Sequence, residues 1–95
     1  MIVREGDRYF LEGPVTIDTV QTALAEGLKL FEGPQVRVDL SRVREVDSAA
    51  VSLLLEWVRV AARAGWSMRY SHLNHNLKSL AALYGLSDLI PGVDD

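Results

Sequence analysis

The sequence has no cysteine and no apolar run long enough to span a membrane. The absence of cysteine excludes disulfide scaffolds, zinc ribbons and thiol catalysis together. A transmembrane helix needs about 20 apolar residues, and no stretch of this chain approaches that length. The first six residues also lack the apolar stretch of a secretory signal peptide, so we expect an intracellular domain.

Positive charge is also scarce, since 10 basic residues stand against 13 acidic ones and give a net charge of −3. No basic block occurs along the chain, so the sequence does not indicate a nucleic-acid partner. Hydrophobic residues make up 48% of the chain and charged residues 24%, which excludes a disordered protein. The length of 95 residues leaves room for one domain, which we place at residues 1–95.

Signatures of catalysis and of metal binding are missing as well. The chain has neither a Gly-x-Ser-x-Gly nucleophile elbow nor a glycine-rich phosphate loop. His72 and His75 are its two histidines, and two imidazoles are too few for a structural zinc site. We therefore expect a protein that is not an enzyme, with no catalytic residue, metal ion or cofactor.

Hydrophobic periodicity, punctuated by glycine and proline, predicts alternating strands and helices. Gly6-Asp7 reads as a hairpin turn between two short strands, and the order that follows predicts an α/β fold with helices packed on a mixed sheet. The predicted order is β-β-α-β-α-β-α, with strands near residues 2–5, 8–12, 35–40 and 66–72 and helices near residues 20–31, 48–64 and 75–84.

The connections between these elements are expected to be polar, including residues 41–47, where Val43 and Val46 are the only apolar anchors. Residues 87–95 are expected to form a short tail. Side chains that accept hydrogen bonds from free backbone N–H groups predict where each helix starts. The predicted caps are Thr16 or Asp18 for the first helix, Asp47 or Ser48 for the second, and Asn74 for the third.

The helix that begins at Ser48 is the most informative segment. Its polar side chains fall within about 80° of one another, and the rest of its surface is apolar. A helix that lies on a sheet needs an apolar stripe only a little wider than about 100°. The excess apolar surface must be covered either by neighbouring helices or by another protein. The polar stripe consists of Ser48, Ser52, Glu56, Arg59 and Arg63.

Ser48 itself has two interpretations. A serine at the start of a helix is most often a cap. Its hydroxyl would also lie at the positive end of the helix dipole, where a phosphate group is well accommodated. Phosphorylation there would add up to about two negative charges to any surface that docks on the helix. Ser48 is therefore a candidate partner contact and a candidate phosphorylation site.

Four stretches of the sequence resemble the STAS domain family, which includes anti-sigma-factor antagonists and cytoplasmic domains of sulfate transporters. The most specific signal is Asp-Leu-Ser followed by Val-Asp-Ser in this order and spacing. The resemblance covers nearly the whole chain and implies a STAS-like sandwich of a mixed β-sheet and packed helices. The stretches are residues 11–16 (LEGPVT), 36–43 (VRVDLSRV), 46–55 (VDSAAVSLLL) and 80–86 (LAALYGL).

Within this family, the small size and the leucine-rich helix are most similar to the STAS subunits of ABC-type phospholipid transporters in Gram-negative bacteria. This branch implies a cytoplasmic subunit, peripheral to the inner membrane, that binds the ATPase subunit and through it the membrane permease. Such systems maintain the lipid asymmetry of the outer membrane. The alternative is an anti-sigma-factor antagonist regulated by phosphorylation of Ser48, and a third class is a small-ligand sensor.

The resemblance also implies which residues meet a partner. Ser48 matches the hydroxyl residue that is phosphorylated in the antagonists and lies at the partner contact in the transporter subunits. Thr16 stands where many antagonists have an acidic residue, and Ala50 stands where they typically have glycine; both departures favour the transporter branch. The expected partner-binding residues are Thr16, Asp47, Ser48, Ala49 and Ser52, extended along the helix by Leu55, Arg59 and Ala62.

Overall fold

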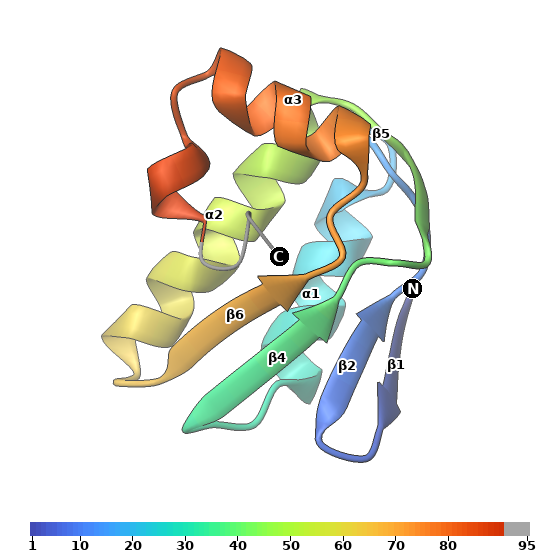
Figure 1. Ribbon diagram of the computed structural model, residues 1–95. Helices are drawn as coiled ribbons and strands as arrows, with labels where there is room; N and C mark the ends of the chain where they lie inside the picture. Colours follow the sequence, from blue (N-terminus) through green and yellow to red (C-terminus); the bar gives the residue numbers. More distant parts are fainter. Residues whose placement is uncertain (91–95) are drawn as a thin grey trace.

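The computed structural model of the chain describes residues 1–90 (Figure 1). Its strands are β1 (Ile2–Glu5), β2 (Arg8–Leu11), β3 (Gly13–Val15), β4 (Gln35–Asp39), β5 (Val43–Val46) and β6 (Ser67–Ser71). Its helices are α1 (Val20–Leu30), α2 (Ser48–Arg63) and α3 (His75–Leu83), followed by a short 3-10 turn, η1 (Ser87–Leu89). None of these helices has both the length and the apolar character needed to cross a membrane.

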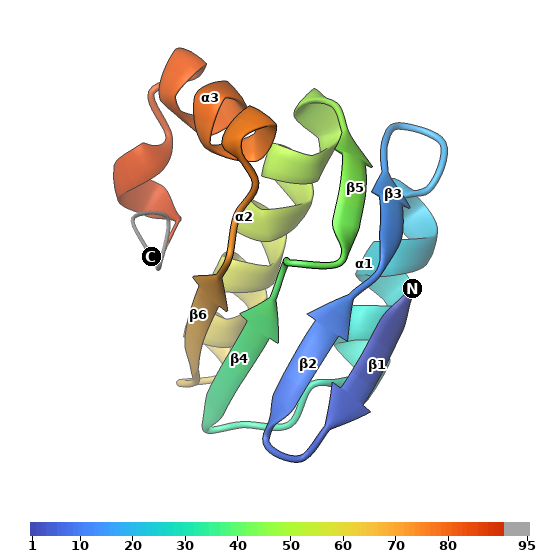
Figure 2. The same ribbon diagram turned by 45° about the vertical axis from the view of Figure 1, so that its right-hand side comes forward.

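The main sheet has four strands in the order β1-β2-β4-β6. β1 and β2 form the predicted antiparallel hairpin, whereas β2, β4 and β6 run parallel to one another. α1 and α2 pack on one face of this sheet, and the other face is open to solvent (Figures 1 and 2). The predicted α/β fold with a mixed sheet is confirmed.

A second sheet, in which β3 and β5 pair in parallel, extends beyond the main one (Figure 2). It was not predicted, because the sequence indicated that residues 41–47 were only a polar connection. The two anchors do turn inward, since Val43 is buried and Val46 is half-buried. Strands of three and four residues contain too few alternations to be recognised from periodicity.

The predicted tail is also partly structured. Ser87–Leu89 form η1, and Ile90 is buried in the core with only 2% of its surface exposed. The rest of that prediction, residues 91–95, lies outside the described residues.

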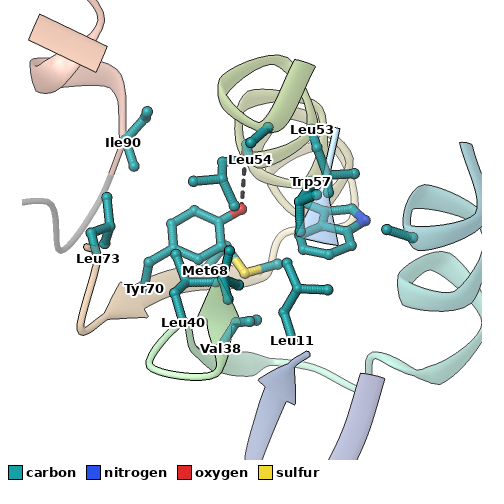
Figure 3. Packing of buried hydrophobic residues seen from close by; sticks show 14 of the residues in the cluster. Leu11, Val38, Leu40, Leu53, Leu54, Trp57, Met68, Tyr70, Leu73 and Ile90 are labelled. Atoms are coloured by element: carbon teal, nitrogen blue, oxygen red, sulfur yellow. Dashed lines mark hydrogen bonds between the residues drawn. The ribbon is translucent and has the colours of Figure 1, made fainter. Parts of the chain in front are cut away.

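The core lies between the main sheet and the helices, around Trp57 and Tyr70 (Figure 3). The Tyr70 hydroxyl donates a 2.7 Å hydrogen bond to the Leu54 carbonyl, so the buried phenol has a partner. Burial raises the pKa of Tyr70 well above its ordinary value. The Trp57 ring meets Phe31 edge to face at 4.9 Å between ring centroids, as expected for a core tryptophan.

Trp57 also fixes the rotation of α1. Its indole packs on Gly27, where an added Cβ would lie only 2.6 Å from ring atoms. Gly27 therefore faces the core. Val20 and Leu24 lie at the margin of the core and are only partly buried, and Leu28 is 49% exposed.

Two of the three predicted helix starts are confirmed. The Asp47 carboxylate accepts a 2.8 Å hydrogen bond from the Ala49 N–H, so Asp47 rather than Ser48 caps α2. The Asn74 side chain accepts a 2.8 Å bond from the Leu77 N–H and caps α3.

The predicted cap of α1 is wrong. The capping position is Thr19, and its side chain makes no hydrogen bond to the helix. The Thr19 hydroxyl instead accepts a bond from the Thr16 N–H and donates one to the Pro14 carbonyl. Thr19 is used to close the loop before α1, which leaves Asp18 exposed and without a capping role.

Candidate functional site

The start of α2 presents an exposed serine hydroxyl. Ser48 is the first residue of the helix, and Asp47 already satisfies the free N–H of Ala49. Within residues 1–90, the Ser48 hydroxyl has no hydrogen-bond partner. It is therefore available to a partner protein or to a modifying enzyme.

Asp47 does more than cap α2, because its second oxygen accepts a 2.9 Å hydrogen bond from the Ile17 N–H. Ile17 belongs to the loop between β3 and α1 and is 72% exposed. One carboxylate thus joins the start of α2 to this loop and holds an exposed isoleucine beside Ser48.

A groove of about 680 Å³ runs between α1 and α2 from this point. Val20, Gln21 and Leu24 of α1 form one wall, and the polar stripe of α2 forms the other. The groove is lined by Ile17, Val20, Leu24, Ser48, Ala49 and Ser52, with Glu56 and Arg59 further along α2.

A second groove, of about 450 Å³, lies on the other side of Ser48 and Ser52, toward the end of α3. Tyr84, which lines it, is 54% exposed, and the adjacent Leu83 is 75% exposed. Ser48 and Ser52 therefore form a ridge between two grooves, each with a large apolar side chain at its margin. We call the ridge and its two grooves the α2 docking surface.

The sequence matches a protein-family model described as "Mlab, STAS domain" over residues 5–91. The chain belongs to this family. A search of the curated proteins gave no match. STAS family membership accounts for the fold.

Solved structures of other proteins have the same STAS fold. The chain is similar to the unphosphorylated anti-sigma factor antagonist SpoIIAA, at 13% identity and a TM-score of 0.71 over 97% of this chain and 85% of that one. It is similar to a sulfate transporter family protein from Wolinella succinogenes, at 19% identity and a TM-score of 0.68 over 93% and 74%. It is also similar to a variant of RsbS from Moorella thermoacetica, at 17% identity and a TM-score of 0.57 over 94% and 75%.

The structure brings most of the predicted partner-binding residues of this STAS domain together. The residues that line the groove between α1 and α2 are Asp47, Ser48, Ala49, Ser52 and Arg59. Arg59 also lies 3.4 Å from Glu56, the pairing expected from their spacing.

Three predicted residues line neither groove. Thr16 is half-buried in the loop, and its neighbour Ile17 takes the position at the groove. Leu55 packs against the core, and Ala62 is exposed near the end of α2. The grooves therefore include the predicted centre at Ser48 but not the predicted extension to Leu55 and Ala62.

Two residues at the surface were missed or misplaced by sequence reasoning. Ile17 was missed, although an isoleucine in a short polar loop directly before a helix is a usable signal. Tyr84 was also missed; it lies at the C-terminal cap of α3 and is exposed.

The Asp-Leu-Ser motif of this STAS domain has a structural role away from the grooves. Asp39 is 3% exposed, and its carboxylate accepts a 2.8 Å bond from the Ser41 N–H and lies 3.0 Å from Nδ1 of His72. Burial is the largest influence on the pKa of Asp39 and raises it, but the bonds from Ser41 and the nearby His72 outweigh burial and lower the pKa. No group of three potential metal ligands occurs within residues 1–90.

Proposed function

We propose that this STAS domain is the non-catalytic subunit of a bacterial ABC-type phospholipid transporter. It binds the ATPase subunit, supports the assembly or activity of that subunit and so contributes to outer-membrane lipid asymmetry. The observation that carries the proposal is the exposed start of α2, which lies between two grooves in a chain that matches the Mlab family.

The α2 docking surface has the composition of a protein interface. Exposed isoleucine, leucine and tyrosine side chains are apolar anchors that a partner buries, and large aromatic residues often dominate binding energy. Ile17, Leu83 and Tyr84 are 72%, 75% and 54% exposed.

The centre of that surface is small and polar. Ser48 and Ser52 offer hydroxyl groups, and Ala49 adds little bulk. A projecting segment of the ATPase subunit can therefore approach the α2 backbone closely, with its flanks in the two grooves.

The second candidate function is an anti-sigma-factor antagonist. The exposed, unpaired Ser48 hydroxyl favours it, and the structural neighbour SpoIIAA is such an antagonist. Against it stands Ala50, which is 2% exposed and occupies the position where antagonists typically have glycine. Both functions use the same surface, so substitution of Ser48 alone does not separate them.

The experiment that tests the proposal is co-expression of the tagged chain with the ATPase and permease subunits of an ABC phospholipid transporter from the same host. We expect a stable complex in which the chain raises ATPase turnover. Removing the chain should reduce the yield or the turnover of the ATPase. Absence of a complex, together with phosphorylation of Ser48 by a serine kinase of the host, would replace the proposal with the antagonist function.

A further inference from the structure

The open face of the main sheet carries a row of three arginines that the proposed function does not use. Arg37 of β4 lies directly opposite Arg69 of β6. The parallel register of β2 and β4 pairs Tyr9 with Val38 and so places Arg8 beside Arg37. All three arginines are exposed and line one shallow pocket of about 180 Å³. We call Arg8, Arg37 and Arg69 the arginine row.

The arginine row by itself should lower the stability of the sheet. Like charges placed directly opposite each other on neighbouring strands destabilise a sheet. Charged residues protect exposed sheet edges, but β6 alone among these three strands is an edge, so edge protection accounts for Arg69 and not for Arg8 or Arg37. Uncharged polar residues would keep the open face of the main sheet equally well hydrated.

Within residues 1–90, acidic groups only partly compensate the charge of Arg8 and Arg37. Arg8 lies 3.5 Å from Asp39, but the same carboxylate oxygen is also 3.0 Å from His72. Arg37 has no ion-pair partner in residues 1–90. A surplus of positive charge therefore remains at the centre of the row, in a protein whose net charge is −3.

We propose that the arginine row binds a phosphate-bearing anion, either a free phosphate compound or a phospholipid headgroup. Guanidinium groups donate paired hydrogen bonds that match the oxygens of phosphate, and they stay charged at every physiological pH. Neighbouring strands are about 4.8 Å apart, so three long side chains can converge on one group above Arg37. The pocket is shallow, which suits a phosphate group presented from solvent or from a membrane surface.

This anion site is separate from the α2 docking surface. α1 and α2 cover the opposite face of the sheet (Figure 2). The two grooves are lined by residues of α1 and α2, the loop before α1 and the end of α3. Both sites can therefore be occupied at once, and the anion site is tested in the isolated chain without the ATPase.

The test is titration of the intact chain with pyrophosphate at constant ionic strength, followed by calorimetry and by amide NMR shifts. Loss of one charge-assisted contact corresponds to about tenfold weaker binding, which we expect for Arg37→Gln and for Arg69→Gln. The control is Arg44→Gln, which removes an exposed arginine from β5 and should bind as the wild type does. Thermal unfolding verifies that each variant is folded.

Vesicles of phosphatidylcholine, with and without phosphatidylglycerol, distinguish the two sources of phosphate. Pyrophosphate binding without vesicle binding identifies a free phosphate compound as the ligand. Binding to the phosphatidylglycerol vesicles that is lost in Arg37→Gln identifies a headgroup. The proposal is overturned if neither probe binds, if Arg37→Gln and Arg69→Gln bind like the wild type, or if Arg44→Gln weakens binding equally.

Discussion

Replacing Asp47 with alanine should cost more stability than the loss of an ordinary helix cap, because its carboxylate makes two bonds. One oxygen lies 2.8 Å from the Ala49 N–H, and the other lies 2.9 Å from the Ile17 N–H. Loss of an N-cap costs about 1 kcal/mol. Loss of a second, charge-assisted bond at a half-buried site costs about 1 kcal/mol more.

We therefore expect Asp47→Ala to lower the free energy of unfolding by about 2 kcal/mol and Tm by about 10 °C. Asp47→Ser should lose about half as much, because serine is a good cap but its single hydroxyl is too short to hold both N–H groups. Urea and thermal unfolding, followed by circular dichroism, measure both changes.

The matched control is Asp18→Ala, which removes the same charge from the β3–α1 loop that Asp47 contacts. Asp18 is exposed and caps nothing, so the free energy of unfolding should change by less than about 0.5 kcal/mol. Equal stability of Asp47→Ala and Asp18→Ala would refute the idea that Asp47 joins α2 to the Ile17 loop.

Three further substitutions test other contacts by urea unfolding. Gly27→Ala places a methyl group 2.6 Å from the Trp57 ring and should cost about 1–3 kcal/mol, and wild-type stability would contradict that packing. Tyr70→Phe removes the 2.7 Å bond to the Leu54 carbonyl and should cost about 1 kcal/mol, whereas no loss would mean that the bond contributes nothing. Asp39 has a lowered pKa in the fold, so its carboxylate stabilises the fold above its unfolded pKa of about 4, and this stability is lost as pH falls through the lower folded pKa. Asp39→Asn should therefore flatten the loss of stability in acid, and an unchanged slope would contradict this role.

The order of the main elements was predictable because each has a strong local signal. Val36 and Val38 alternate with polar residues along β4, and the predicted polar stripe of α2 is mostly exposed, from Ser48 to Arg63. β3 and β5 were not predictable, since neither is stable without the other and each is too short to show a period.

The candidate site also contains some residues that were predictable from the sequence and some that were not. Asp47 and Ser48 were predictable because a helix start is a local feature. The partial exposure of Val20 and Leu24 and the exposure of Tyr84 depend instead on how α1 and α3 are rotated and where they end. For α1, that rotation is set by the contact of Trp57 with Gly27, which lies 30 residues earlier in the chain.

The arginine row also could not be predicted from the sequence alone. Its three members lie on separate strands, and no two of them are close in the sequence. The linear chain therefore shows no basic block, and only the register of β2, β4 and β6 assembles the charge.

The central claim, that the start of α2 docks on an ABC ATPase, is tested most directly by the affinity of the purified chain for the purified ATPase subunit. A bulky charge placed in a desolvated contact costs a few kcal/mol, so we expect Ser48→Arg to bind about 100-fold more weakly than the wild type. Arg44→Gln, on β5, should bind as the wild type does. Wild-type affinity of Ser48→Arg for the ATPase would contradict the claim.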